Sequence, residues 1–139
     1  MDRIDELEAQ HRRLEDLFHE IGLARDLGTR AEILGELGRE LIAHVALEER
    51  LIHRAATAAP REAGLWEDWE DRLRVERLAI ALGAIDPSAP SFSAQVASLQ
   101  DLFEERLEPE ETRLFLKLRR SGGGGRRGFE STLVMGGTQ

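Results

Sequence analysis

The sequence predicts an all-α protein: an antiparallel up-down-up-down four-helix bundle with a flexible Gly-rich C-terminal tail. Three observations lead to this fold class. Apolar residues recur at steps of three and four in four long segments, the joins between segments contain glycine or proline, and no segment alternates like a strand. Helices with short joins pack as antiparallel neighbours. We therefore expect residues 1–120 to form the bundle and residues 121–139 to form a Gly-rich linker and short apolar tail.

Composition limits the chemistry that this chain can perform. Its 139 residues suffice for one domain with its own core, so any bound metal would serve function rather than folding. The absence of cysteine leaves nitrogen and oxygen ligands, which favours iron, manganese or zinc. A net charge of -8 argues against a nucleic-acid partner. Because the N-terminus is charged and no long apolar run exists, we expect a cytoplasmic protein and no membrane partner.

The first helix is expected over roughly residues 2–26, with His11 on its inner face. Thr29 and Glu32 then form a capping-box pattern, which predicts a second helix over roughly residues 30–58. The inner row of the first helix consists of Ile4, Leu7, His11, Leu14, Phe18 and Ile21.

Residues 41–53, in the second helix, carry two polar side chains where apolar ones are expected. These are His44 and Glu48, one helical turn apart. A buried imidazole and carboxylate need a metal, an ion pair or a hydrogen-bond network to compensate them, and the spacing leaves all three open. The row that contains them reads Leu34, Leu37, Leu41, His44, Glu48, Leu51 and Ala55.

The third helix follows Pro60 and has two competing inner rows. One row places Glu76 inside, and the other places it outside, so its direction stays open at this point. The first row reads Trp66, Trp69, Leu73, Glu76 and Ile80, and the second reads Val75, Leu78, Leu82 and Ile85.

The fourth helix is expected to start at Ser91 or Ser93 and to reach about Arg120. Pro109 lies within it and removes a backbone donor, so we expect a kink or restart there and an uncertain phase beyond it. Glu110 is the polar member of its inner row, which reads Val96, Leu99, Phe103, Leu107, Glu110, Leu114 and Leu118.

Bundle geometry allows a test of whether the inward polar residues lie at one level. Residues equidistant from a turn share a height in antiparallel helices. The position that lies as far after a turn near residue 28 as His11 lies before it is beside His44. The same reflection of Glu48 through a turn near residue 60 gives a position about one helical turn from Glu76. Glu76 reflected near residue 88 falls ten residues short of Glu110. The levels therefore agree for three helices and not for the fourth.

Three stretches resemble the hemerythrin-like family, also called the HHE cation-binding domain, whose bundles hold a non-haem di-iron site. Residues 10–18 (QHRRLEDLF) are similar to its first-helix histidine segment, and residues 44–49 (HVALEE) to its His-x-x-x-Glu-Glu motif. Residues 106–111 (RLEPEE) are similar to the fourth-helix copy of that motif, with Arg106 where histidine is usual. The likeness covers about residues 2–120.

The resemblance implies a metal site with an altered ligand set. The family's third-helix histidine has no counterpart, so Glu76 would be a substitute carboxylate. The implied cofactor is non-haem iron, as a di-iron pair, with manganese or zinc as alternatives and no metal as another. Arg106 would either point away or pair with Glu48 or Glu110 in the vacated metal position. The implied metal ligands are His11, His44, Glu48, Glu76 and Glu110.

Two functions follow from this resemblance. The first is a metal-binding protein that handles iron or senses O2, NO or redox state, with a small diatomic ligand as partner. The alternative is a metal-free degenerate bundle that acts as an interaction or scaffold protein, in which residues 129–135 contact a partner protein. The Gly-rich linker with its short apolar end also resembles the cargo-targeting tails of proteins packaged in encapsulin shells, which would make the bundle encapsulin-type cargo. A disordered tail without function is a further alternative for those residues. Whether the chain is an enzyme stays open.

Overall fold

The computed structural model describes residues 2–58 and 68–121, and for residues 68–75 it describes the backbone only. Within these ranges the chain is helical and contains no strand, as predicted. The last three elements follow one another without a break and form one long helical segment. The elements are α1 (Arg3–Leu23), α2 (Leu27–Ala58), α3 (Asp68–Gly83), α4 (Phe92–Pro109), the π-helical η1 (Glu110–Leu114) and α5 (Phe115–Arg120).

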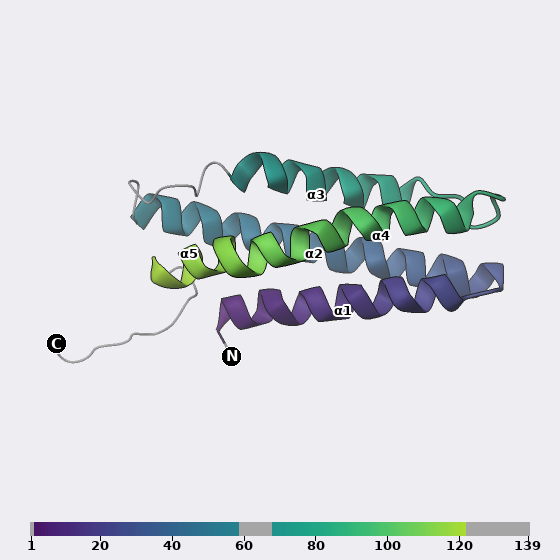
Figure 1. Ribbon diagram of the computed structural model, residues 1–139, viewed down its shortest axis with the longest axis horizontal. Helices are drawn as coiled ribbons and strands as arrows, with labels where there is room; N and C mark the ends of the chain where they lie inside the picture. Colours follow the sequence, from purple (N-terminus) through teal and green to yellow (C-terminus); the bar gives the residue numbers. More distant parts are fainter. Residues whose placement is uncertain (1, 59–67, 122–139) are drawn as a thin grey trace.

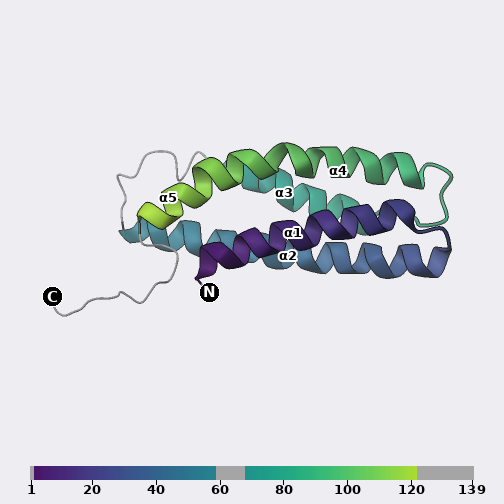
Figure 2. The same cartoon turned by 60° about the horizontal axis from the view of Figure 1, so that its bottom comes forward.

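The long helices lie alongside one another (Figure 1). The chain leads away from the N-terminus along α1 and returns along α2, and it then leads away along α3 and returns along α4, η1 and α5. The turned view in Figure 2 shows the same alignment. Contacts join α1 to α2, α2 to α3, α3 to α4 and α4 to α1, so each long helix packs against two others.

The starts of α1 and α2 follow local capping rules, and the start predicted for the second helix is wrong. Asp2 begins α1 with a capping box, in which the backbone N–H of Asp5 donates to its side chain at 2.8 Å. Asp26 accepts from the backbone N–H of Thr29 at 2.9 Å, so α2 begins before the expected capping box of Thr29 and Glu32. The expectation failed because Asp26 satisfies the first free backbone donors one turn earlier.

A layer of polar residues divides the core into two apolar clusters. The larger cluster includes Phe18, Leu37, Leu41, Leu82 and Phe103. The smaller cluster includes Ile4, Leu7, Ile52, Phe115 and Leu118. At the boundary between the two clusters lie the four buried polar residues of the described core, His11, His44, Glu48 and Glu110.

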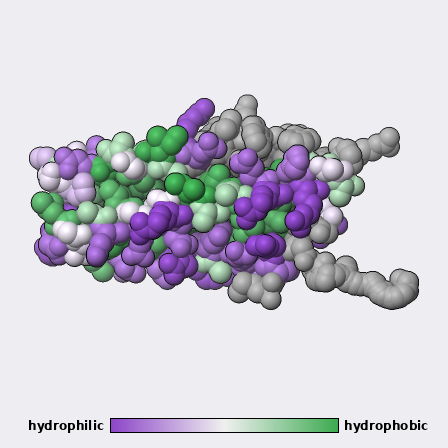
Figure 3. Space-filling model, turned by 180° about the vertical axis from the view of Figure 1, so that it is seen from behind, coloured by the Kyte–Doolittle hydropathy of each residue, from purple (hydrophilic) through white to green (hydrophobic). Residues whose placement is uncertain are grey.

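The surface is mainly hydrophilic, with apolar side chains exposed between charged ones. Figure 3 shows this mixture on the face opposite to that of Figure 1. The most exposed large apolar residues of the described chain include Leu23 on α1, Ile42 on α2 and Ile80 on α3. Among the described helices, none combines the length and the hydropathy that a membrane span requires.

Candidate metal centre

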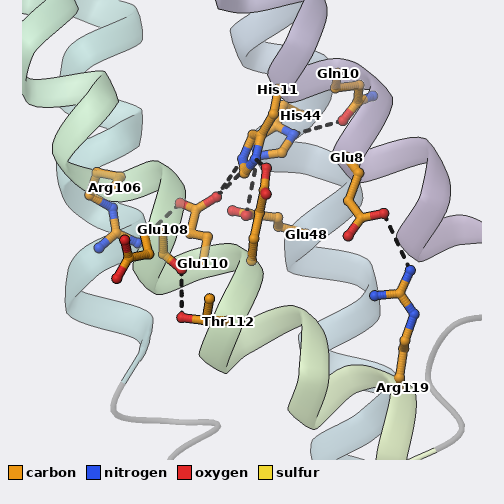
Figure 4. A network of polar contacts seen from close by, with 11 residues as sticks. Glu8, Gln10, His11, His44, Glu48, Arg106, Glu108, Glu110, Thr112 and Arg119 are labelled. Atoms are coloured by element: carbon orange, nitrogen blue, oxygen red, sulfur yellow. Dashed lines mark hydrogen bonds and ion pairs between the residues drawn. The ribbon is translucent and has the colours of Figure 1, made fainter.

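Four buried polar side chains meet in the middle of the bundle. His11 comes from α1, His44 and Glu48 come from α2, and Glu110 comes from η1. Their exposed fractions are 2%, 1%, 0% and 3%, so water does not solvate them. Each offers one ligand atom, and these atoms all lie within 4.8 Å of one another. Figure 4 shows their side chains converging between the helices.

Both imidazole rings direct their Nε2 atoms at carboxylate oxygens. Nε2 of His11 lies 2.8 Å from Oε1 of Glu110. Nε2 of His44 lies 3.4 Å from the same oxygen and 3.2 Å from Oε2 of Glu48. Two nitrogens and two carboxylates therefore surround one small volume.

The other nitrogen of each ring is held from outside this volume. Nδ1 of His11 lies 2.8 Å from Oε2 of Glu111, and Nδ1 of His44 donates to Oε1 of Gln10 at 2.8 Å. A donor bond at Nδ1 fixes the ring orientation and leaves the Nε2 lone pair for a metal ion, as at most protein histidine ligands.

Sequence reasoning missed the contacts of Gln10 and Glu111 with the Nδ1 atoms of the two histidines. Both residues adjoin a histidine or carboxylate of the inner rows, and both are half-buried. The signal that could have found them is a polar side chain beside an inward ligand, at the rim of the buried stripe.

The η1 segment explains how Glu110 reaches the cluster. Pro109 has no backbone N–H, and the next donor, that of Glu110, is shared between the carbonyls of Arg106 and Leu107. The backbone N–H of Phe115 then bonds the carbonyl of Glu110, five residues back. The kink or restart expected at Pro109 is thus a π-helical turn. It brings two consecutive carboxylates to the two nitrogens of His11.

Charges within the cluster perturb one another strongly. Burial opposes a charge on His44, but the carboxylates of Glu48 and Glu110 outweigh it and raise the pKa of His44 to about 10. Burial and the charge of Glu110 raise the pKa of Glu48 to about 7, although His44 acts in the opposite direction. Burial also acts to raise the pKa of Glu110, but hydrogen bonds from His11 and His44 hold it well below its usual range.

Glu48 provides a test of whether these residues suit a metal. Both of its oxygens are buried without an aligned hydrogen bond, although His44 is close. A buried carboxylate without such bonds costs several kcal/mol, and a divalent cation removes that cost. Two imidazoles and two carboxylates form a donor set that suits iron, manganese or zinc. The residues therefore fit a metal ion.

Glu76 and Arg106 show how the third and fourth helices depart from expectation. Glu76 is exposed beside Ile80 and does not join the cluster, because α3 turns Leu78 and Leu82 to the core. The structure therefore does not bring Glu76, the substitute carboxylate that the resemblance implied, to the cluster. Arg106 lies at the edge of the cluster, with Nη2 3.0 Å from Oε2 of Glu110. Arg106 therefore pairs with Glu110, one of the two carboxylates suggested as its partner from the sequence.

Comparisons with known proteins identify the family of this chain. Residues 2–118 match the family model described as the hemerythrin HHE cation binding domain. The chain is 28% identical over 115 residues to a protein of Nostoc sp. named DNA nickase, an alignment that covers 83% of this chain and 33% of that protein. The chain thus spans about a third of that relative's length. No solved structure matches it. The match over nearly all the described residues establishes that the chain belongs to the hemerythrin HHE cation-binding domain family.

Proposed function

We propose that this domain binds iron through His11, His44, Glu48 and Glu110. One observation carries the proposal: two imidazole Nε2 atoms and two buried carboxylates converge on one volume. Each ring is also held from its far side, and Glu48 is left without an aligned hydrogen bond. Such an arrangement is unfavourable unless a cation compensates it.

The surroundings suit a centre with restricted access to water. Leu14 and Leu41 are fully buried on one side of the polar layer, and Phe115 stacks on His11 at 5.2 Å on the other. The side chain of Leu73, a member of one inner row expected for the third helix, lies outside the described residues. Iron held by these four residues would supply a binding position for a small diatomic ligand such as O2 or NO. Iron handling or sensing in the cytoplasm is the role that we infer, and manganese or zinc suits the same donors.

Metal analysis of the purified protein tests this proposal. We expect iron to be bound after expression in iron-supplemented medium, and His44→Ala to remove most of it. His53→Ala is the matched control, because His53 lies on the same helix with an exposed side chain. Metal retained in full by His44→Ala would overturn the ligand assignment.

A metal-free scaffold is the second candidate function. The contact between Arg106 and Glu110 favours it, because the guanidinium already supplies a cation to the cluster. Residues 129–135, which lie outside the described residues, would then contact a partner protein. Protein that binds no iron, manganese or zinc at millimolar concentration would favour this candidate over the first.

A further inference from the structure

Glu110 divides its two carboxylate oxygens between different partners. Oε1 faces the imidazoles, at 2.8 Å from His11 Nε2 and 3.4 Å from His44 Nε2. Oε2 faces the guanidinium of Arg106 at 3.0 Å. The carboxylate therefore already bridges the ligand volume to one fixed cation on its other side.

The donors in the described residues suffice for one ion. Within those residues, His11, His44, Glu48 and Glu110 form the one group of three or more possible ligands that lie close enough together. Four protein ligands make a complete set for one transition metal, with or without an added small ligand. Glu76 is exposed on α3 and adds nothing to the cluster.

Charge leads to the same number. The Arg106 guanidinium already places a positive charge 3.0 Å from Oε2 of Glu110. A second divalent ion next to Oε2 of Glu110 would meet the guanidinium at contact distance, in a poorly solvated site where repulsion is strong.

We propose that this centre holds a single metal ion, and that the Arg106 guanidinium occupies the place beside Glu110 where a second cation would otherwise bind. This inference rests on the proposed metal-binding function. It assigns Arg106 the role of a positioning residue, which orients Glu110 and limits the centre to one ion.

A shorter side chain can replace Arg106 without disturbing the packing of the neighbouring helices. Arg106 forms part of the wall of a pocket of about 320 Å3 between α3 and α4, which Leu78, Ala81 and Leu99 also line. A shorter side chain in place of Arg106 therefore enlarges this pocket. Water can fill the added space, so α3 and α4 need not move closer together.

Metal stoichiometry tests the inference on the full chain. Metal-free protein is titrated anaerobically with Mn²⁺, and binding is followed by calorimetry and by the electron paramagnetic resonance spectrum of the bound ion. We expect one ion per chain, with the hyperfine pattern of an isolated Mn²⁺. Two exchange-coupled ions per chain would overturn the inference and leave the proposed function standing. No bound ion, with Mn²⁺ or with Fe²⁺, would overturn both.

Variants of Arg106 separate its proposed role from a general structural one. Arg106→Gln removes a positive charge beside the metal, so we expect Mn²⁺ to bind on the order of tenfold more tightly. Arg106→Glu replaces the guanidinium with a carboxylate, and we expect it to admit a second ion. The matched control is Arg119→Gln, which removes an arginine that pairs with Asp5 at 3.0 Å and Glu8 at 3.4 Å on another face.

The stability gained from metal is the readout that a structural role would not change. If Arg106 only braces the helices, Arg106→Gln lowers the melting temperature equally with and without Mn²⁺, as Arg119→Gln should. Under our proposal, the rise in melting temperature on adding Mn²⁺ is larger in Arg106→Gln than in the unmodified chain. An unchanged affinity in Arg106→Gln, together with one ion in Arg106→Glu, would overturn the role of Arg106.

Discussion

At Glu48 the requirements of stability and of metal binding oppose each other. The side chain is fully buried, and burial together with the charge of Glu110 raises its pKa to about 7. The carboxyl group of Glu48 is therefore harder to ionise in the folded, metal-free protein than in the unfolded chain. An isosteric neutral residue should suit the empty core better than the native one does.

We expect Glu48→Gln to stabilise the metal-free protein at pH 8. The free energy of unfolding should rise by on the order of 3 kcal/mol at most. A pKa raised from 4.5 to about 7 adds that much to the free energy of ionising Glu48 in the folded state. The same change should weaken metal binding by about a hundredfold or more, because it removes a charged ligand. Urea unfolding with a chelator present and metal titration measure the two effects. Glu49→Gln, at the exposed neighbouring position, is the control, and a less stable Glu48→Gln would contradict this account.

The stability of the metal-free protein should fall as pH rises from about 6 to 9. The pKa of His44 is raised from 6.5 to about 10, so its stabilising charge is complete below pH 6.5 and is lost as pH rises towards 10. Glu48 acts in the same direction between pH 4.5 and about 7, where the folded state binds more protons than the unfolded one.

Metal should reverse this slope, because ligands bind it only after losing their protons. Unfolding free energies at about pH 6, 7.5 and 9, with chelator and with Mn²⁺, measure both slopes. Equal slopes in the two conditions would mean that the ion does not bind at these residues.

At the scale of elements, periodicity predicted the helices well and their relative levels less well. Reflection through the helix turns falls ten residues short of Glu110. The reason is that the reflection passes through Glu76, which is not in the polar layer. The better reference is the contact of Arg30 with the Phe92 ring, at 4.7 Å, which aligns the starts of α2 and α4. Glu48 follows Arg30 by 18 positions, and Glu110 follows Phe92 by the same 18. That contact joins distant parts of the chain, so spacing alone does not reveal it.

The π-helical turn could not be foreseen in detail from Pro109, which indicates a disturbance but not its form. A π turn is an α-helix with one additional residue. Deleting the exposed Thr112 should therefore restore a regular helix and disturb the simultaneous contacts of Glu110 and Glu111 with His11. We expect unchanged helical circular dichroism and at least tenfold weaker metal binding. Undiminished binding would show that the π turn is dispensable for the centre.

For the whole molecule, the sequence indicated which polar residues meet in the core, but it did not indicate that Glu76 stays apart from them. His11, His44, Glu48 and Glu110 were recognisable because each interrupts an apolar row, and burial then forces such residues together. Glu76 lay on one of two rows of similar apolar character, and the choice between them depends on how α3 packs. One helix seen alone does not contain that information.

The described bundle should account for metal binding without the tail. All four cluster residues and both apolar clusters lie between Ile4 and Leu118. We expect a chain that ends at Ser121 to keep the melting temperature and metal content of the full chain. A drop in either would mean that residues 122–139 contribute to the fold or to the centre. The intact chain is the control.

The polar layer between two apolar clusters also governs how the helices align during folding. If α1 slid by one turn, about 5.4 Å, against α4 and η1, His11 would lose both carboxylates and Glu110 would face leucine. Purely apolar rows would tolerate that displacement, whereas a buried charge without its partner costs several kcal/mol. The residues that we assign to the metal thus also select one alignment of the bundle among several of similar apolar contact.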